Sequence, residues 1–307
     1  MNNDLQALPK LRDSISYIYL EHAVIEQEDS SIVAIQKDGR TSIPVSALTC
    51  LMLGPGTKVT HAAMKAAAEH GCMIVWCGEN GMRFYASGMG ETRSAANLLR
   101  QAELCSNPET RLEVAKRMYI RRFGSISNPD YTLQQLRGME GIRVKEAYKL
   151  ASRSTGISWS ARSYKKDDWN AQDPVNLALS QANALLYSVC QAAIISLGYS
   201  AGLGFIHTGK QLSFVYDVAD LYKAEVTIPA AFQSAKYPGT DLSAAVRVNC
   251  RKYFQQIRLL KRIPEDIEWI FNLPGSEKRE SLPVGNLWDP DGEIPGGVNH
   301  HGDEELW

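Results

Sequence analysis

The residues best suited to chemistry lie between positions 198 and 223, where one histidine precedes two aspartates and a lysine. Asp217 and Asp220 are three residues apart, so on a helix their carboxylates share one face. Two like charges on one face repel, and either a metal ion or Lys223 could neutralise them. Oxygen ligands with one imidazole, that of His207, favour Mg²⁺ or Mn²⁺ over zinc. The stretch predicts a divalent-metal site that can orient a hydroxyl or water nucleophile and polarise a phosphodiester.

A further carboxylate, Glu140, lies upstream in a helical pattern between two glycines. Each glycine weakens the helix, which suits close approach of another molecule to the backbone. The alternative is a surface glutamate paired with Arg137 or Arg143, and spacing alone leaves both readings open. His207 also has a structural alternative, because single histidines are more often structural than ligands.

The charge of the chain is unevenly distributed. From Pro264 onward lie eleven of the 34 acidic residues but only two of the 33 basic ones, so residues 1–263 carry a formal charge of +8. A basic body with an acidic tail indicates nucleic-acid binding, or a basic protein partner for the tail. Ordinary solvated charge is the alternative.

The remaining composition describes a globular protein. A chain of 307 residues is long enough for two domains. The six cysteines are scattered without a CxxC motif, so we expect neither zinc nor disulfides. We find no signal-peptide pattern and no apolar run that would cross a bilayer, and we expect a cytoplasmic protein without a membrane partner.

The elements that must position the site change character near residue 90. Residues 14–85 are rich in β-branched and aromatic residues and contain one short helix, with Thr60 as its N-cap and Gly71 as its stop. Beyond residue 90, helical spacing of apolar residues takes over. The helical ranges are 92–123 (split near Asn107-Pro108), 131–155, 175–197, 214–224 and 241–262, with a short helix at 265–272.

These patterns divide the chain into three units. We predict a β-rich domain at 1–90, an α-helical catalytic domain at 91–273 and an acidic tail rich in proline and glycine at 274–307.

Four separated motifs carry a resemblance to a known family. They are LGPGTKVTHAA, WCGENGMRFYASG, QLRGMEGIRVKEAY and GFIHTGKQLSFVYDVADLYK. With these motifs, the chain resembles the CRISPR-associated integrase of the adaptation module, the Cas-one family, and most of all its type I-E branch. The resemblance is collinear from about residue 14 to 262.

The resemblance implies an α+β fold, with an N-terminal β-sandwich-like domain and a C-terminal all-α catalytic domain, working as a homodimer. Two dimers would flank a dimer of the small Cas-two protein. The assembly would capture double-stranded prespacer DNA with 3′ overhangs and insert it into CRISPR repeat DNA. In the implied transesterification, the prespacer 3′-hydroxyl attacks a phosphodiester without a covalent protein intermediate.

The resemblance also assigns roles to single residues. The family's metal ligands fall on Glu140, His207 and Asp220, with Mg²⁺ or Mn²⁺ as the ion. Asp217 matches an accompanying acid that supports the site, and Lys223 would stabilise the phosphate electrostatically. The loop glycines near His207 would let a DNA end approach.

DNA contacts follow from the resemblance position by position, and cations and tyrosines suit phosphates and unpaired bases. The implied contacts are Lys58, Lys65, Arg83 and Arg111 on the duplex backbone, Arg137, Tyr164, Tyr187 and Lys210 around the single-stranded 3′ end, and Arg247 and Arg251 on further backbone positions. One position departs from the family. His22 replaces a tyrosine that wedges against the duplex end, and it offers less stacking area and a charge that varies with pH.

Two other functions remain open from the residues. One is a stand-alone metal-dependent DNA endonuclease or junction resolvase that uses water as the nucleophile. The other is a non-catalytic DNA-binding scaffold that needs no metal. For the tail we expect docking on the small partner through Leu287, Trp288 and Ile294, with a disordered solubilising tail as the alternative.

Overall fold

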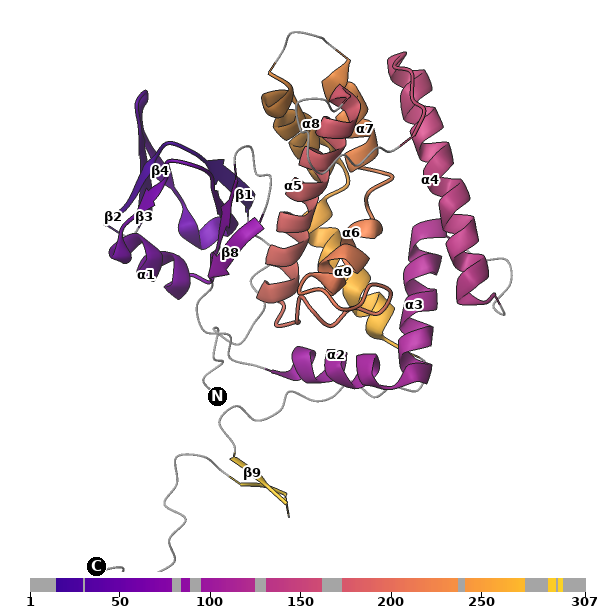
Figure 1. Cartoon of the computed structure of the whole chain (residues 1–307). Coiled ribbons are helices and arrows are strands. Elements are labelled where there is room, and N and C mark those ends of the chain that lie inside the picture. Colours follow the sequence, from indigo (N-terminus) through magenta and orange to yellow (C-terminus); the bar gives the residue numbers. More distant parts are fainter. Residues whose placement is uncertain are drawn as a thin grey trace, which may run out of the picture.

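The structure is a computed structural model. A strand-rich N-terminal part is followed by a helical part (Figure 1). This order confirms the expected α+β class. The structure describes residues 15–29, 31–78, 84–88, 95–124, 131–161, 173–236, 241–273, 287–290 and 292–294.

Two four-stranded sheets form the N-terminal part, as expected for a β-sandwich-like unit. In the first, β1 (Ile15–Leu20) and β7 (Met73–Cys77) run parallel to β5 (Leu48–Leu53), and β8 (Phe84–Gly88) runs antiparallel to β7. The second sheet is an antiparallel meander with a short parallel strand at its edge. Its strands are β2 (Val24–Glu28), β3 (Ser31–Gln36), β4 (Gly39–Ile43) and β6 (Lys58–Val59).

Strands β5 and β7 are buried on both faces. Leu51 and Ile74 contribute to a core shared with β2, β3 and the helix α1, whereas Met52 and Val75 belong to the core of the helical part. Alternate side chains of a strand point to opposite faces, so both faces demand apolar residues. Burial on both faces explains the uninterrupted apolar runs of these strands. One face of the first sheet shares its core with the helices.

The single helix of the N-terminal part, α1 (His61–Glu69), begins and ends as predicted. The Thr60 hydroxyl oxygen accepts a hydrogen bond from the Ala63 amide. Gly71, with φ +63°, ends the segment in a left-handed conformation that glycine adopts without strain.

Helix α5 (Pro174–Ser196) is the centre of the helical part, and it contacts α6, α7, α8, α9 and the first sheet. Helix α4 (Leu133–Thr155) lies at the outer edge, beside α3 and α7 (Figure 1). The other helices are α2 (Ala96–Ser106), α3 (Pro108–Phe123), α6 (Ser213–Asp220), α7 (Thr227–Ala235), α8 (Leu242–Gln256) and α9 (Leu259–Phe271).

The pattern missed α7. Pro229 lies in its first turn, where the missing amide would have no intrahelical partner, so the proline is tolerated. The burial of Ile228 and Phe232 then offsets the weak helix propensity of the first residues.

The predicted boundary between the last two helices was wrong. A single helix over 241–262 was expected, yet the chain breaks at Arg258, which has φ +49°, and α9 continues through Pro264. The buried face of α9, formed by Leu259, Ile263 and Ile267, keeps the helix together across the proline.

Helix α5 is, contrary to the expectation, long and apolar enough over Pro174–Ile195 to cross a membrane by length and composition. Of this stretch, 72% is buried inside the structure. Its apolar character therefore matches a core helix that is covered on most sides.

The described part of the tail contains a short antiparallel hairpin. Strand β9 (Leu287–Asp289) pairs with β10 (Gly292–Ile294), and this places Leu287 opposite Ile294. Two of the three expected docking residues are thus neighbours in register. The docking itself stays a prediction.

Candidate active site

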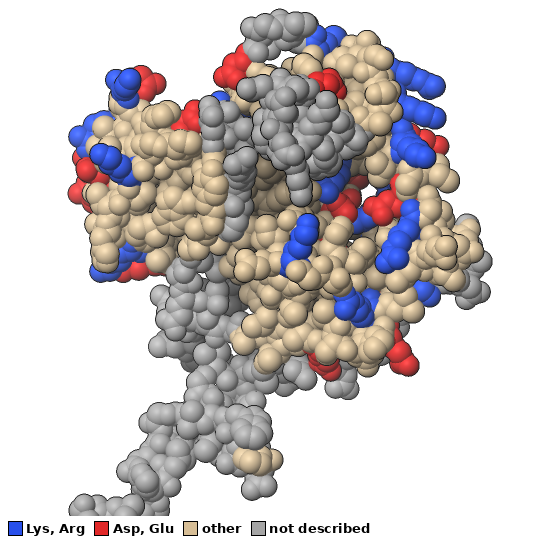
Figure 2. Space-filling model, in the orientation of Figure 1, with Lys and Arg blue, Asp and Glu red and all other residues tan. Residues whose placement is uncertain are grey.

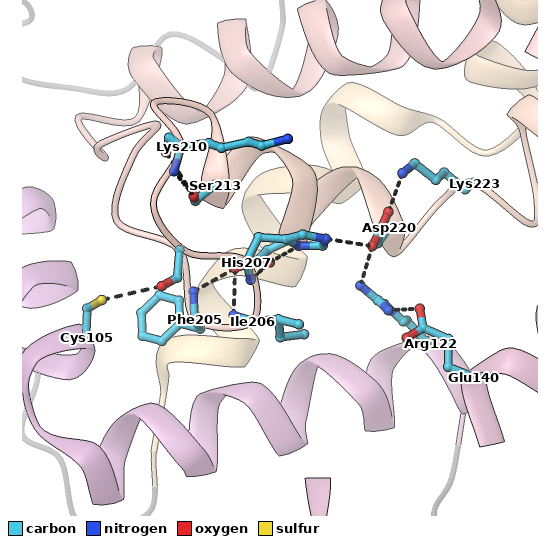
Figure 3. Close-up of polar contacts among 12 residues, drawn as sticks. Cys105, Arg122, Glu140, Phe205, Ile206, His207, Lys210, Ser213, Asp220 and Lys223 are labelled. Atoms are coloured by element: carbon cyan, nitrogen blue, oxygen red, sulfur yellow. Dashed lines mark hydrogen bonds and ion pairs between the residues drawn. The ribbon is translucent and has the colours of Figure 1, made fainter. Parts of the chain in front are cut away.

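A tight loop ahead of α6 is built around the carboxylate of Asp217, which is fully buried. Its Oδ2 accepts hydrogen bonds from the amides of Phe205, at 2.6 Å, and Ile206, at 3.1 Å. Its Oδ1 accepts one from the amide of His207, at 2.9 Å (Figure 3). One carboxylate thus fixes the path of three consecutive residues that end at His207.

The same carboxylate orients the His207 ring. Nδ1 lies 2.7 Å from Asp217 Oδ1. A carboxylate oxygen accepts, so Nδ1 carries the proton and Nε2 is left to bind elsewhere. This hydrogen bond raises the pKa of His207 above its ordinary value, against the opposing effect of partial burial. Nε2 lies 4.0 Å from Asp220 Oδ2, and 43% of the side chain is exposed.

Asp220 lies at the end of α6 between two cations. Its Oδ1 is 2.5 Å from Lys223 Nζ, and its Oδ2 is 3.3 Å from Arg122 Nη2. Burial alone would raise the pKa of Asp220, but Lys223 and Arg122 outweigh it and hold the pKa below its ordinary value. For Lys223, burial lowers the pKa, and the charge of Asp220 together with Tyr187 more than compensates and raises it. Both groups are therefore charged at neutral pH.

Glu140 reaches this cluster only through an arginine. It projects from α4 and forms an ion pair with Arg122 Nη1, whose side chain comes from α3 (Figure 3). Arg122 thereby joins Glu140 to Asp220. The sequence suggested Arg137 or Arg143 as the ion-pair partner of this glutamate. That suggestion was wrong, because the partner is Arg122.

A cavity of about 230 Å³ opens beside the cluster. Glu140, Asp220 and Lys223 line it together with apolar side chains of α4 and α7, and Asn183 contributes an amide oxygen that has no hydrogen-bond partner. Figure 2 shows acidic and basic side chains side by side in a recess of the helical part. Two of the three predicted ligand residues, Glu140 and Asp220, thus line one cavity, and His207 approaches Asp220 from outside its lining.

The donor set fits a divalent cation after one rearrangement. As placed, no three His, Cys, Asp or Glu side chains in the described residues are close enough to hold an ion. The two carboxylates nevertheless converge on one guanidinium, and His207 Nε2 faces Asp220. If Glu140 left Arg122 and joined Asp220 and His207, the three would supply an imidazole and two carboxylates, a set suited to Mg²⁺ or Mn²⁺.

The predicted DNA contacts fall into three groups, and all of them stay predictions. Five are exposed cations, although Lys65 also lies 3.7 Å from the exposed Glu69. These five are Lys58, Lys65, Arg137, Lys210 and Arg251. Arg83 and Tyr164 lie outside the described residues.

The other three predicted DNA contacts among the described residues are half-buried and pack against the protein. Arg247 lies over the ring of Tyr19, at 5.5 Å, which links α8 to the first sheet. Tyr187 packs edge-on against Tyr216, with ring centroids 5.0 Å apart, and Lys223 Nζ lies 4.9 Å from its centroid.

Arg111 is the third. Its Nε and Nη2 each lie 3.1 Å from the carbonyl oxygens of Phe205 and Gly204, respectively, so it holds the loop that leads to His207.

Gly204 in that loop has a structural reason beyond access for DNA. A Cβ added there would lie 2.4 Å from the His207 carbonyl oxygen and 2.7 Å from Ser213 Cβ. The loop packs too closely against α6 for any other residue. By contrast, Gly138 and Gly141 on α4 have open space around the position of a Cβ, so packing within the chain does not require glycine at either position.

Arg122 is the site residue that sequence reasoning missed. It falls on the buried face of α3 with Val114, Met118 and Tyr119. An arginine at a core position of an amphipathic helix needs buried charged partners, and this signal was present in the sequence. The partners themselves come from α4 and α6, which no local pattern connects to α3.

A second buried ion network lies behind the site and is structural. Asp266 of α9 is fully buried and accepts hydrogen bonds from Arg121 Nε, at 2.6 Å, and from the Tyr222 hydroxyl, at 2.8 Å. Arg262 Nε lies 3.4 Å from the same carboxylate. The network ties α3 and α9 to the segment that follows Asp220.

Comparison with known proteins gives one consistent result. A family model described as CRISPR associated protein Cas1 matches residues 16–128 and 120–237. The CRISPR-associated endonuclease Cas1 2 of Thermus thermophilus is 48% identical over 98% of this chain and 94% of its own. The CRISPR-associated endonuclease Cas1 of Escherichia coli is 41% identical over 84% of this chain and 85% of its own. A crystal structure of a TtCas1–DNA complex superposes with a TM-score of 0.81 at 47% identity, covering 92% of this chain and all of the other. The chain therefore belongs to the CRISPR associated protein Cas1 family.

Proposed function

We propose that the protein is a metal-dependent DNA integrase of CRISPR adaptation, which captures prespacer DNA and joins its 3′-hydroxyl ends to the repeat by transesterification. The observation that carries this function is the cluster of His207, Asp220 and Lys223, to which Arg122 joins Glu140, and Glu140, Asp220 and Lys223 line one open cavity. It is supported by membership of the Cas1 family and by the likeness to a Cas1 structure with DNA.

The side chains divide the work as follows. Asp217 keeps the His207 ring in the orientation that leaves Nε2 free, and it fixes the loop. Glu140, His207 Nε2 and Asp220 would hold Mg²⁺ or Mn²⁺. When bound, such an ion lowers the pKa of a hydroxyl nucleophile and withdraws charge from the phosphate. Lys223, held charged by Asp220, adds positive potential at the same cavity.

The bond changes balance without an external reactant. The prespacer 3′-oxygen loses its proton and forms a bond to phosphorus, while the bond from phosphorus to the 3′-oxygen of the repeat strand breaks. That leaving oxygen takes up a proton. One phosphodiester replaces another, so the residues need only to position and stabilise charge.

DNA would reach the site along cationic surfaces. The exposed Lys58, Lys65, Arg137, Lys210 and Arg251 are available to phosphates, in keeping with the positive charge of residues 1–263. Figure 2 also shows Lys and Arg side chains along the edge near α4, where Lys145, Lys149 and Arg153 are exposed.

We further propose the partners expected of an integrase of this kind: a homodimer, the small Cas-two protein, and double-stranded DNA with 3′ overhangs. The acidic tail would dock on the small partner, and the pairing of Leu287 with Ile294 supports a preformed anchor. A chain truncated at Pro283 should lose the partner in a pull-down. Undiminished capture would refute docking through the tail.

The function is tested with two single substitutions. His207→Ala and Asp220→Ala should abolish strand transfer of a labelled prespacer into repeat DNA, because each removes a predicted ligand, while duplex binding in a gel shift stays largely intact. Glu265→Gln, an exposed position on α9 outside the predicted ligands and DNA contacts, is a control that keeps the cluster whole. Full integration activity in both alanine variants would refute the assignment of His207 and Asp220 to the catalytic site.

A hydrolytic nuclease is the second candidate, and the names of the relatives, CRISPR-associated endonucleases, favour considering it. It would cleave branched DNA in Mn²⁺ without a partner and would give no strand-transfer product. A non-catalytic scaffold would instead show binding and products that are unchanged by a chelator.

A further inference from the structure

The guanidinium of Arg122 occupies a costly position. Only 4% of its side chain is exposed, and it extends from the apolar face of α3. Burying a charge is unfavourable unless ion pairs and hydrogen bonds replace the lost water. The position therefore demands a reason other than packing.

Its ion-pair partners are two of the three residues expected to hold the divalent ion. Arg122 Nη1 pairs with Glu140 Oε1, and Nη2 lies 3.3 Å from Asp220 Oδ2. The pairing is incomplete, because Nε and Nη2 are buried without a hydrogen-bond partner. Tyr119 contributes the face of its ring, 5.2 Å from the guanidinium carbon. Arg122 thus neutralises the carboxylates without being held in an ideal hydrogen-bond geometry.

We propose that Arg122 is the internal counter-cation of the metal-free site, which holds Glu140 and Asp220 together and gives up Glu140 when a divalent cation binds. The exchange half of this inference rests on the proposed metal dependence. The bridging half rests on the ion pairs alone.

The exchange follows from charge and space. Lys223 already occupies Oδ1 of Asp220, so an incoming ion would use the Oδ2 side, which faces both His207 Nε2 and Arg122. An ion there would lie beside a buried guanidinium, and like charges at short range in a partly buried site repel strongly. An ion at the paired oxygen of Glu140 would bring a second cation against the guanidinium that this oxygen already neutralises. The guanidinium therefore competes with the ion that the cluster is built to bind.

The inference predicts opposite effects on stability and on metal affinity. In Arg122→Met, the metal-free protein should melt at a lower temperature, because two carboxylates lose their shared cation. The same variant should bind Mn²⁺ at least about tenfold more tightly, because repulsion and competition are gone. The rise in melting temperature on adding Mn²⁺ should be larger than in the wild type. A residue with a merely structural role would weaken Mn²⁺ binding when removed.

The measurement is a Mn²⁺ titration of the full chain, read from the electron paramagnetic resonance signal of free Mn²⁺, with thermal melts in chelator and in Mn²⁺. Arg143→Met is the matched control. Arg143 lines the same cavity, but its guanidinium lies over Phe123, at 5.6 Å. Arg122→Lys keeps one positive charge, so it should stay folded even if Arg122→Met does not. Its affinity for Mn²⁺ should lie within a few-fold of the wild-type affinity.

Each half can fail separately. For the bridge, Glu140→Gln is combined with Arg122→Met, and their stability effects in chelator should be far from additive. Additive effects would overturn the bridge, whatever the metal does. For the exchange, Mn²⁺ affinity in Arg122→Met equal to or weaker than wild type would overturn the competition. If the wild type binds Mn²⁺ no better than His207→Ala does, the proposed metal dependence fails, and the exchange fails with it. The double-mutant comparison of Arg122→Met and Glu140→Gln in chelator would still decide whether Arg122 bridges the two carboxylates.

Discussion

Replacing Asp217 by asparagine keeps the shape of the side chain but exchanges one acceptor oxygen for an amide donor. The carboxylate accepts four hydrogen bonds: two on Oδ2 from the Phe205 and Ile206 amides, and two on Oδ1 from the amide and Nδ1 of His207. An asparagine can satisfy only one of these oxygen positions. Its orientation therefore decides which bonds are lost.

The two orientations differ in their consequences. If the new amide group faces Phe205 and Ile206, two buried backbone donors lose their acceptor, at about 1–3 kcal/mol each. If it faces His207, one backbone donor is lost, and the ring can accept at Nδ1 by moving its proton to Nε2. The second orientation costs less and leaves one backbone donor without its acceptor, so we expect Asp217→Asn to destabilise the protein by roughly 1–3 kcal/mol. It should also place the proton on the nitrogen that the site needs free.

The two effects are measured separately. Urea unfolding reports the loss of stability, and nitrogen chemical shifts of the histidine ring report which nitrogen carries the proton. Strand transfer should fall by at least about 10–100-fold, the usual cost of losing the group that orients a ligand histidine. Wild-type stability together with a wild-type rate would refute the reasoning, since four hydrogen bonds to one buried carboxylate cannot be exchanged without effect.

Two further substitutions probe the frame around the site. Gly204→Ala should lower both stability and strand transfer, because its Cβ would collide with the His207 carbonyl and with Ser213, whereas Gly138→Ala, with open space on an exposed helix face, should be neutral or slightly stabilising. A Gly204→Ala protein as stable and active as wild type would contradict the close packing. Asp266→Asn should cost roughly 2–4 kcal/mol of unfolding free energy, since it removes the charge of a fully buried carboxylate that pairs with Arg121 and Arg262, while Glu265→Gln on the exposed side of α9 should change little. Urea midpoints decide this comparison, and a loss below about 1 kcal/mol at Asp266 would show that the network contributes little.

Local patterns predicted most of the elements. Period-two and period-3.6 spacing located most strands and most helices, and the Thr60 cap and the Asn107-Pro108 split mark boundaries that the structure keeps. The hairpin of β9 and β10 was not predicted. Two of the failures involve a proline. Pro229 lies where a helix needs no amide, and Pro264 lies in a helix whose buried face outweighs the lost hydrogen bond.

The sequence by itself determined which residues could do chemistry, because residue types and spacing placed His207, Asp217, Asp220 and Lys223 on one short segment. Only the tertiary structure decided their roles. It buried Asp217 completely and made it the support of His207, and it brought α3 against α4 and α6 so that Arg122 lies between Glu140 and Asp220. Spacing along the chain reports which side chains share one face of one element. Which charges meet across three helices depends on how those helices pack, and no local pattern contains that information.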